Sequence, residues 1–159
     1  MVHWHLLWGA PLAKRIEPVR KRVPEILDDL LAGHREAAFS GPDSARRYLL
    51  STLERQDSLP RAVRAVLFDL LAEAEAQRQA WESCDAAVGE ALALIPDLEA
   101  EFPHQGAAMV QAMTCFERGI QARSELGDFR GARLLAREAV TRGLGAHFQA
   151  KADSLAWAE

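Results

Sequence analysis

The sequence predicts an all-α protein, built as a stack of antiparallel helical hairpins with about seven helices. Ala, Leu, Glu and Arg are abundant, Tyr occurs once, and runs of β-branched residues are scarce, which favours helix over strand. Breaks made of Gly, Pro and Asp recur at regular intervals along the chain. Sequential helices with short connections pack as antiparallel neighbours, and the regular breaks favour a stack over a closed four-helix bundle.

A pattern of one aromatic residue followed by small residues occurs twice in the second half of the chain. The small residues stand at +3, +7 and +10 from the aromatic residue, and the second copy follows the first by 48 residues. The copies are Trp81 with Cys84, Val88 and Ala91, and Phe129 with Ala132, Ala136 and Ala139. This repetition indicates helix pairs packed side by side.

The N-terminal elements begin with an arm or short helix over residues 1–17, followed by a helical domain over residues 18–159. Gly9 and Pro11 interrupt any long helix in the arm, and we expect its tryptophans to dock on the body of the domain. An apolar stripe then predicts the first helix of the domain, with Pro18 or Pro24 at its start. The stripe consists of Val19, Val23, Ile26, Leu27, Leu30 and Leu31. A turn over residues 41–44 leads into a second helix, whose apolar face is Ala45, Tyr48, Leu49 and Leu53.

The C-terminal elements are separated by equally clear breaks. Residues 57–60 precede a long helix with Val63, Val66, Leu67, Leu70, Leu71 and Ala74 on its inner face. A further helix runs from about Ser83 to Ile95 and ends at Pro96, and another covers Gly106 to Leu126. Gly127 fits the C-terminal cap of that helix, and Asp128 caps the next, which runs to Arg142. The last helix covers about His147 to Ala158, after the stop at residues 143–145.

The composition excludes several classes of function. Residues 65–159 hold 15 Asp and Glu against 8 Lys and Arg, and this acidity disfavours nucleic acid as a partner. No apolar run approaches 18 residues and no signal peptide is evident, so we expect no membrane association and a cytoplasmic location. Cys84 and Cys115 have no Cys or His at ligand spacing, and His3 and His5 have no carboxylate placed to complete a site. We therefore expect neither a metal nor a cofactor.

The chain resembles the tetratricopeptide repeat family. One copy spans residues 65–98, with Phe68, Leu71, Ala72, Trp81, Cys84, Val88, Ala91, Leu92 and Pro96 at the family's spacing. A second copy, over residues 112–144, keeps Phe116, Gly119, Gly127, Asp128, Phe129, Ala132, Ala136 and Ala139. It has one extra residue between Gly119 and Gly127, and Arg123 near the position where the family often has Tyr. A weaker copy over residues 24–56 keeps Gly33, Ala45, Leu49 and Leu53. The separation of 48 residues exceeds the standard 34, so the stack is expected to be irregular.

The resemblance implies a non-enzymatic interaction module, a scaffold or adaptor that binds a partner protein or peptide in a groove. The first helix of each pair would line this groove with Asp69, Glu73, Ala76, Glu117, Gln121 and Ser124. The family members that clamp a peptide carboxylate use basic residues and Asn there. This chain has carboxylates instead, so a basic peptide or helix is the expected partner.

Two other interpretations remain open at this stage. Trp4, Leu7 and Trp8 could pack on a neighbouring protomer and make the protein a self-associating structural or regulatory homo-oligomer. Arg142 and His147 have the R-x4-H spacing that resembles the motif of helical HEPN ribonucleases. In that family the pair stands at a helix start, whereas here it straddles the Gly143-Leu144-Gly145 turn.

Overall fold

The computed structural model describes residues 22–55 and 58–158, which form eight helices and no strand. The helices are α1 (Val23–Phe39), α2 (Pro42–Arg55), α3 (Arg61–Gln77), α4 (Trp81–Glu101), α5 (Gly106–Ala112), α6 (Cys115–Glu125), α7 (Phe129–Thr141) and α8 (His147–Leu155). The predicted all-α stack of helical hairpins is confirmed. The predicted arm over residues 1–17 lies outside the described residues.

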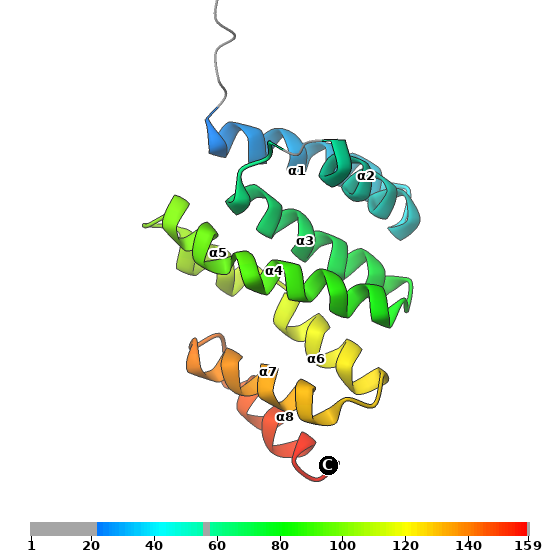
Figure 1. The fold of residues 1–159 in the computed structure, drawn as a ribbon, viewed down its shortest axis with the longest axis vertical. Helices are drawn as coiled ribbons and strands as arrows, with labels where there is room; N and C mark the ends of the chain where they lie inside the picture. The colour runs from blue at the N-terminus through cyan, green and yellow to red at the C-terminus, as the bar shows by residue number, and fades with distance from the viewer. Residues whose placement is uncertain (1–21, 56–57, 159) are drawn as a thin grey trace, which may run out of the picture.

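Three hairpins follow one another along the long axis of the molecule (Figure 1). They are α1 with α2, α3 with α4, and α6 with α7, and α8 packs against α7 at the C-terminal end. α3 also contacts α1 and α6, so the first helices of the three hairpins lie next to one another. α5 packs against α4 between the second and third hairpins.

The repeated pattern marks the second helix of each of the last two hairpins. Trp81 is the first residue of α4 and Phe129 is the first residue of α7. All six residues at +3, +7 and +10 are completely buried, so they form the seam along which the hairpin helices approach. α2 follows the same rule from Pro42, because Ala45, Leu49 and Thr52 are buried at the same three offsets. The weak first copy is therefore a hairpin with the same packing.

The turns inside the second and third hairpins are built alike. Gln79 (φ 58°) and Gly127 (φ 80°) both adopt the left-handed conformation that ends a helix. In each turn this residue donates its N–H to the carbonyl three residues back, and the following residue donates to the carbonyl five residues back. The repetition after 48 residues thus extends from the buried seam to the backbone of the turn.

Two predicted helix boundaries are wrong. α4 does not stop at Pro96 but continues to Glu101, because the turn after the proline buries Leu98 completely against the core. The predicted helix from Gly106 to Leu126 is instead two helices, α5 and α6, separated at Met113, whose backbone is extended (φ −67°, ψ 146°). The extension of α4 and the insertion of α5 account for the long separation between the two copies.

In the described part of the chain, no helix combines the length and the apolar character that crossing a membrane requires.

Candidate partner-binding surface

Asp69 on α3 holds the start of α6. One of its carboxylate oxygens accepts hydrogen bonds from the backbone N–H groups of Thr114 (2.9 Å) and Cys115 (2.7 Å). Only 6% of the residue is exposed. Burial raises the pKa of Asp69 to about 6, although the two N–H donors lower it. This corrects the prediction that Asp69 shares a partner-binding groove with the residues of α6, because its carboxylate caps the start of α6 and it does not line the pocket beside that helix.

Glu73, one turn further along α3, is joined to α6 by Arg118. Arg118 donates from Nε to Oε2 (2.6 Å) and from Nη2 to Oε1 (3.0 Å) of Glu73, and from Nη1 to Gln121 (2.9 Å). These bonds hold the pKa of Glu73 below its usual value. Ala76, the remaining predicted groove residue of α3, is buried and therefore not accessible to a partner.

Glu117 joins α6 to α8 in the same way. Its Oε1 lies 2.5 Å from Nε2 of His147, and its Oε2 accepts a hydrogen bond from the ammonium group of Lys151. Partial burial raises the pKa of Glu117, but the bonds from Lys151 and His147 outweigh this and lower it overall. The three side chains remain between 36% and 55% exposed, so the cluster is open to solvent.

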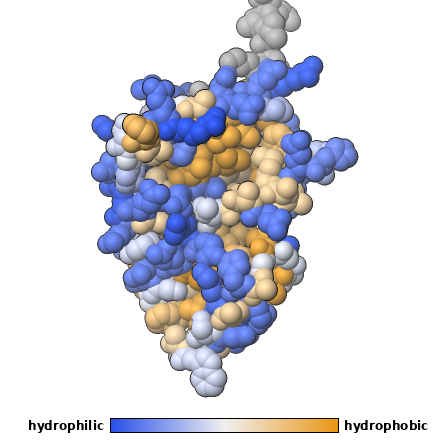
Figure 2. Space-filling view, turned by 180° about the vertical axis from the view of Figure 1, so that it is seen from behind, coloured by the Kyte–Doolittle hydropathy of each residue, from blue (hydrophilic) through white to orange (hydrophobic). Residues whose placement is uncertain are grey.

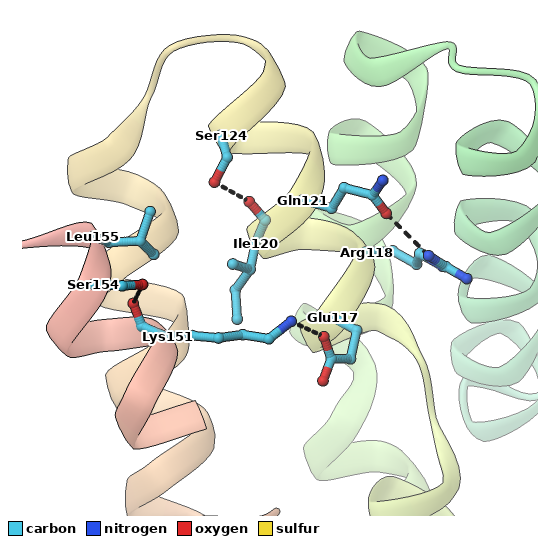
Figure 3. A pocket seen from close by; sticks show the side chains of 8 residues that line it. All are labelled: Glu117, Arg118, Ile120, Gln121, Ser124, Lys151, Ser154 and Leu155. Atoms are coloured by element: carbon cyan, nitrogen blue, oxygen red, sulfur yellow. Dashed lines mark hydrogen bonds and ion pairs between the residues drawn. The ribbon is translucent and has the colours of Figure 1, made fainter. Parts of the chain in front are cut away.

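A pocket of about 380 Å³ lies between α6 and α8. It is lined by Glu117, Arg118, Ile120, Gln121, Ser124, Lys151, Ser154 and Leu155. Figure 3 shows Lys151 reaching from α8 to Glu117, while Arg118 turns away toward the neighbouring hairpin. The pocket thus has an apolar patch of Ile120 and Leu155 inside a rim of charged and amide groups.

The pocket contains three of the six predicted groove residues. Glu117, Gln121 and Ser124 line it together, whereas Asp69 and Ala76 are buried elsewhere and Glu73 contacts it only through Arg118. Sequence reasoning missed Arg118, Lys151 and Leu155. Lys151 could have been noticed, because it is the only lysine in residues 65–159. Arg118 gave no signal, because its carboxylate partner Glu73 is 45 residues away.

Each of the three predicted groove carboxylates already has a partner within the chain. Asp69 binds two backbone amides, Glu73 binds Arg118, and Glu117 binds Lys151 and His147. The carboxylates that were expected to form an acidic surface are therefore bound within the chain, two of them in ion pairs and Asp69 to backbone amides.

Arg142 and His147, the two residues with the spacing of a nuclease motif, form ion pairs with different carboxylates. Arg142 contacts Glu138 (3.2 Å) and Glu99 (3.7 Å), whereas His147 contacts Glu117. Each side chain is thus held against a different carboxylate.

The two cysteines are buried free thiols. Burial raises the pKa of Cys84 to about 11 and raises that of Cys115 further, which keeps both thiols protonated at neutral pH. Within residues 22–55 and 58–158, no group of three or more His, Cys, Asp or Glu side chains is arranged to hold a metal ion.

Comparisons of the chain with protein-family models, with curated proteins and with solved structures found no match.

Proposed function

We propose that this protein is a non-enzymatic interaction module, similar to a tetratricopeptide repeat domain, which binds a peptide segment or helix of a partner protein across α6 and α8. The observation that carries the proposal is the open pocket between these helices, with its apolar patch and polar rim. Interfaces of this kind take their affinity from an apolar anchor and their specificity from surrounding hydrogen bonds.

The chemistry of the pocket defines the partner segment. Leu155 is partly exposed and offers a surface for one apolar side chain, with the buried Ile120 in the same lining, and Gln121, Ser124 and Ser154 offer hydrogen-bonding groups around it. The salt bridge between Glu117 and Lys151 is partly exposed, so a charged partner of either sign can replace one of its members. The basic partner expected from the sequence is therefore only one of the segments that would fit.

The proposal is supported by the hydrogen bonds and ion pairs that fix α6, the helix on one side of the pocket. α6 is fixed at its start by Asp69, along its length by the pair of Arg118 with Glu73, and toward α8 by Glu117. A surface held in this way loses little conformational entropy when a partner binds.

Site-specific crosslinking in cells tests the proposal. A photo-reactive amino acid at Ser124, inside the pocket, should crosslink one defined protein that the same amino acid at Leu134 does not. Leu134 is the matched control because it is 56% exposed on α7 and does not line the pocket. Leu155→Asp should abolish the crosslink, whereas Leu134→Asp should leave it.

Two results would overturn the proposal. One is a Ser124 crosslink that survives Leu155→Asp while helicity is retained. The other is an identical set of crosslinked proteins from Ser124 and Leu134.

A further inference from the structure

A second groove lies between α1, α3 and α5 and is almost entirely apolar. It has a volume of about 240 Å³. Its lining consists of Leu27 and Leu31 from α1, Val66, Asp69 and Leu70 from α3, Met109 and Ala112 from α5, and Met113 directly after α5. Asp69 is the one polar residue of the lining, and its carboxylate is bound to the amides of Thr114 and Cys115. The groove shares no residue with the pocket between α6 and α8.

The apolar side chains of this groove are accessible. Leu31, Val66, Leu70, Met109 and Met113 are all partly exposed, whereas comparable residues of the core are buried. Figure 2, which shows the molecule from behind, has apolar surface gathered at the level of α1 and α3. Contiguous exposed apolar surface of this kind is typical of a site that another segment covers.

The chain itself has an apolar segment that precedes α1, one of the three helices that line the groove. Residues 1–21 lie outside the described residues, and they join the structure at Arg22, directly before α1. The stretch from Trp4 to Trp8 holds two tryptophans and two leucines, followed by Gly9. It is the only stretch outside the described residues with this density of large apolar side chains.

The connection is long enough to return to the groove. Leu27 is four residues into α1, about 6 Å along the helix axis from its first residue. Residues 9–22 can span up to about 46 Å when extended, so they reach the groove without difficulty. A tethered segment of this length has an effective concentration on the order of millimolar, which a separate partner would have to exceed.

The side chains on the two sides are chemically matched. Tryptophan buries a large apolar area, and the thioethers of Met109 and Met113 make favourable contacts with aromatic rings and adapt to their shape. The connecting residues carry Lys14, Arg15, Arg20 and Lys21, which complement the acidic side chains of Glu25 and Asp28 on α1.

We propose that Trp4, Leu7 and Trp8 dock into the groove formed by α1, α3 and α5 of the same chain. The apolar arm expected from the sequence then covers the apolar surface at the N-terminal end of the stack. This inference does not depend on the function proposed above, because it concerns a different groove and needs no partner protein.

Methionine methyl NMR on the full chain tests the docking directly. The chain has three methionines, and two of them line the groove. Their methyl resonances, identified with Met109→Leu and Met113→Leu, should move when Trp4 and Trp8 are both replaced by Ala, because the ring currents of the tryptophans are lost. Trp157→Ala is the matched control, because Trp157 is 92% exposed at the other end of the stack, and it should leave both resonances in place.

A second measurement follows the tryptophans of the arm instead of the methionines of the groove. With fluorinated tryptophan, Trp4 and Trp8 should be protected from solvent in the unaltered chain and become exposed in Leu70→Asp, while Trp81 keeps its signal. Unchanged methionine resonances in the Trp4→Ala, Trp8→Ala variant would overturn the proposal. Resonances that shift with dilution, together with a dimeric mass, would also overturn it, because the arm would then come from a second copy.

Discussion

Glu75 of α3 and Arg123 of α6 occupy equivalent positions in successive hairpins and carry opposite charges. Glu75 pairs with Arg46 of α2 (2.6 Å), and Arg123 pairs with Asp85 of α4 (2.9 Å). Arg46 and Asp85 each stand four residues after the start of their helix. The two ion pairs therefore connect successive hairpins at the same position, with the positive and negative residues exchanged. Placing α6 against α2 would set Arg123 opposite Arg46, so the exchanged charges disfavour that alternative stacking.

Reversing one partner of the second ion pair should destabilise the protein, and reversing both should restore most of the loss. We expect Arg123→Asp to lower the free energy of unfolding by about 1–2 kcal/mol, since it faces Asp85 with a like charge and loses the bond from Arg123 to the carbonyl of Gly131. Adding Asp85→Arg should recover the ionic part only. A double-mutant cycle from urea unfolding measures the coupling, and simple additivity of the two changes would contradict it.

Asp69→Ala should loosen the start of α6. The change leaves the amides of Thr114 and Cys115 without an acceptor, so we expect a loss of about 1–2 kcal/mol in the free energy of unfolding. Hydrogen exchange at these two amides should accelerate selectively. Asp69→Asn keeps an acceptor oxygen and should have a much smaller effect. Equal losses from the two variants would show that the cap is not what Asp69 contributes.

The ionisation of Asp69 should make the protein less stable as the pH rises from about 4 to 6. Its pKa is raised to about 6 in the folded protein from an ordinary value of 3.8, so the folded state holds the proton more tightly than the unfolded state. The stabilisation from the protonated group is present below the lower value and lost above the higher one, and it amounts to about 3 kcal/mol at most.

The measurement compares unfolding of the unaltered chain and Asp69→Asn between pH 4 and 7, a range that lies mostly above the lowered pKa of Glu73. The difference in stability between the two proteins should change in favour of Asp69→Asn as the pH rises. A constant difference would show that Asp69 titrates near its ordinary pKa.

Two glycine substitutions should have opposite signs. A Cβ at Gly119 would lie 2.5 Å from Leu135 and 2.7 Å from Val88, so Gly119→Ala overfills the contact of α6 with α4 and α7 and should cost about 1–3 kcal/mol. A Cβ at Gly89 of α4 meets nothing within 4 Å, and Gly89→Ala should stabilise the protein by about 0.5–1 kcal/mol through helix propensity. Thermal unfolding of both variants checks the pair, and destabilisation of equal size would contradict the role of Gly119.

Local features of the sequence could predict the hairpins but not the contacts between them. The seam after Trp81 and Phe129 and the stop at Gly127 depend on neighbouring residues, and the structure confirms them. The continuation of α4 past Pro96 and the break at Met113 depend on tertiary packing, which a local pattern does not contain.

The predicted groove likewise shows that a local pattern does not reveal tertiary contacts. Asp69, Glu73 and Glu117 have the spacing of exposed carboxylates on helix faces. Their partners come from other parts of the chain: Arg118 is 45 residues from Glu73, Cys115 is 46 residues from Asp69, and Lys151 is on α8. Charge along one helix therefore predicted an acidic surface, whereas only the folded arrangement shows that Glu73 and Glu117 are paired with cations and that Asp69 is buried.

The cap that Asp69 provides has a consequence for how this stack can vary in length. The start of α6 is held by a side chain of α3, which lies about 45 residues earlier in the sequence. We therefore expect the third hairpin to keep its phase relative to the second when the exposed residues between α4 and α5 are lengthened or shortened. The most irregular connection of the sequence is thus one where we expect insertions to be tolerated.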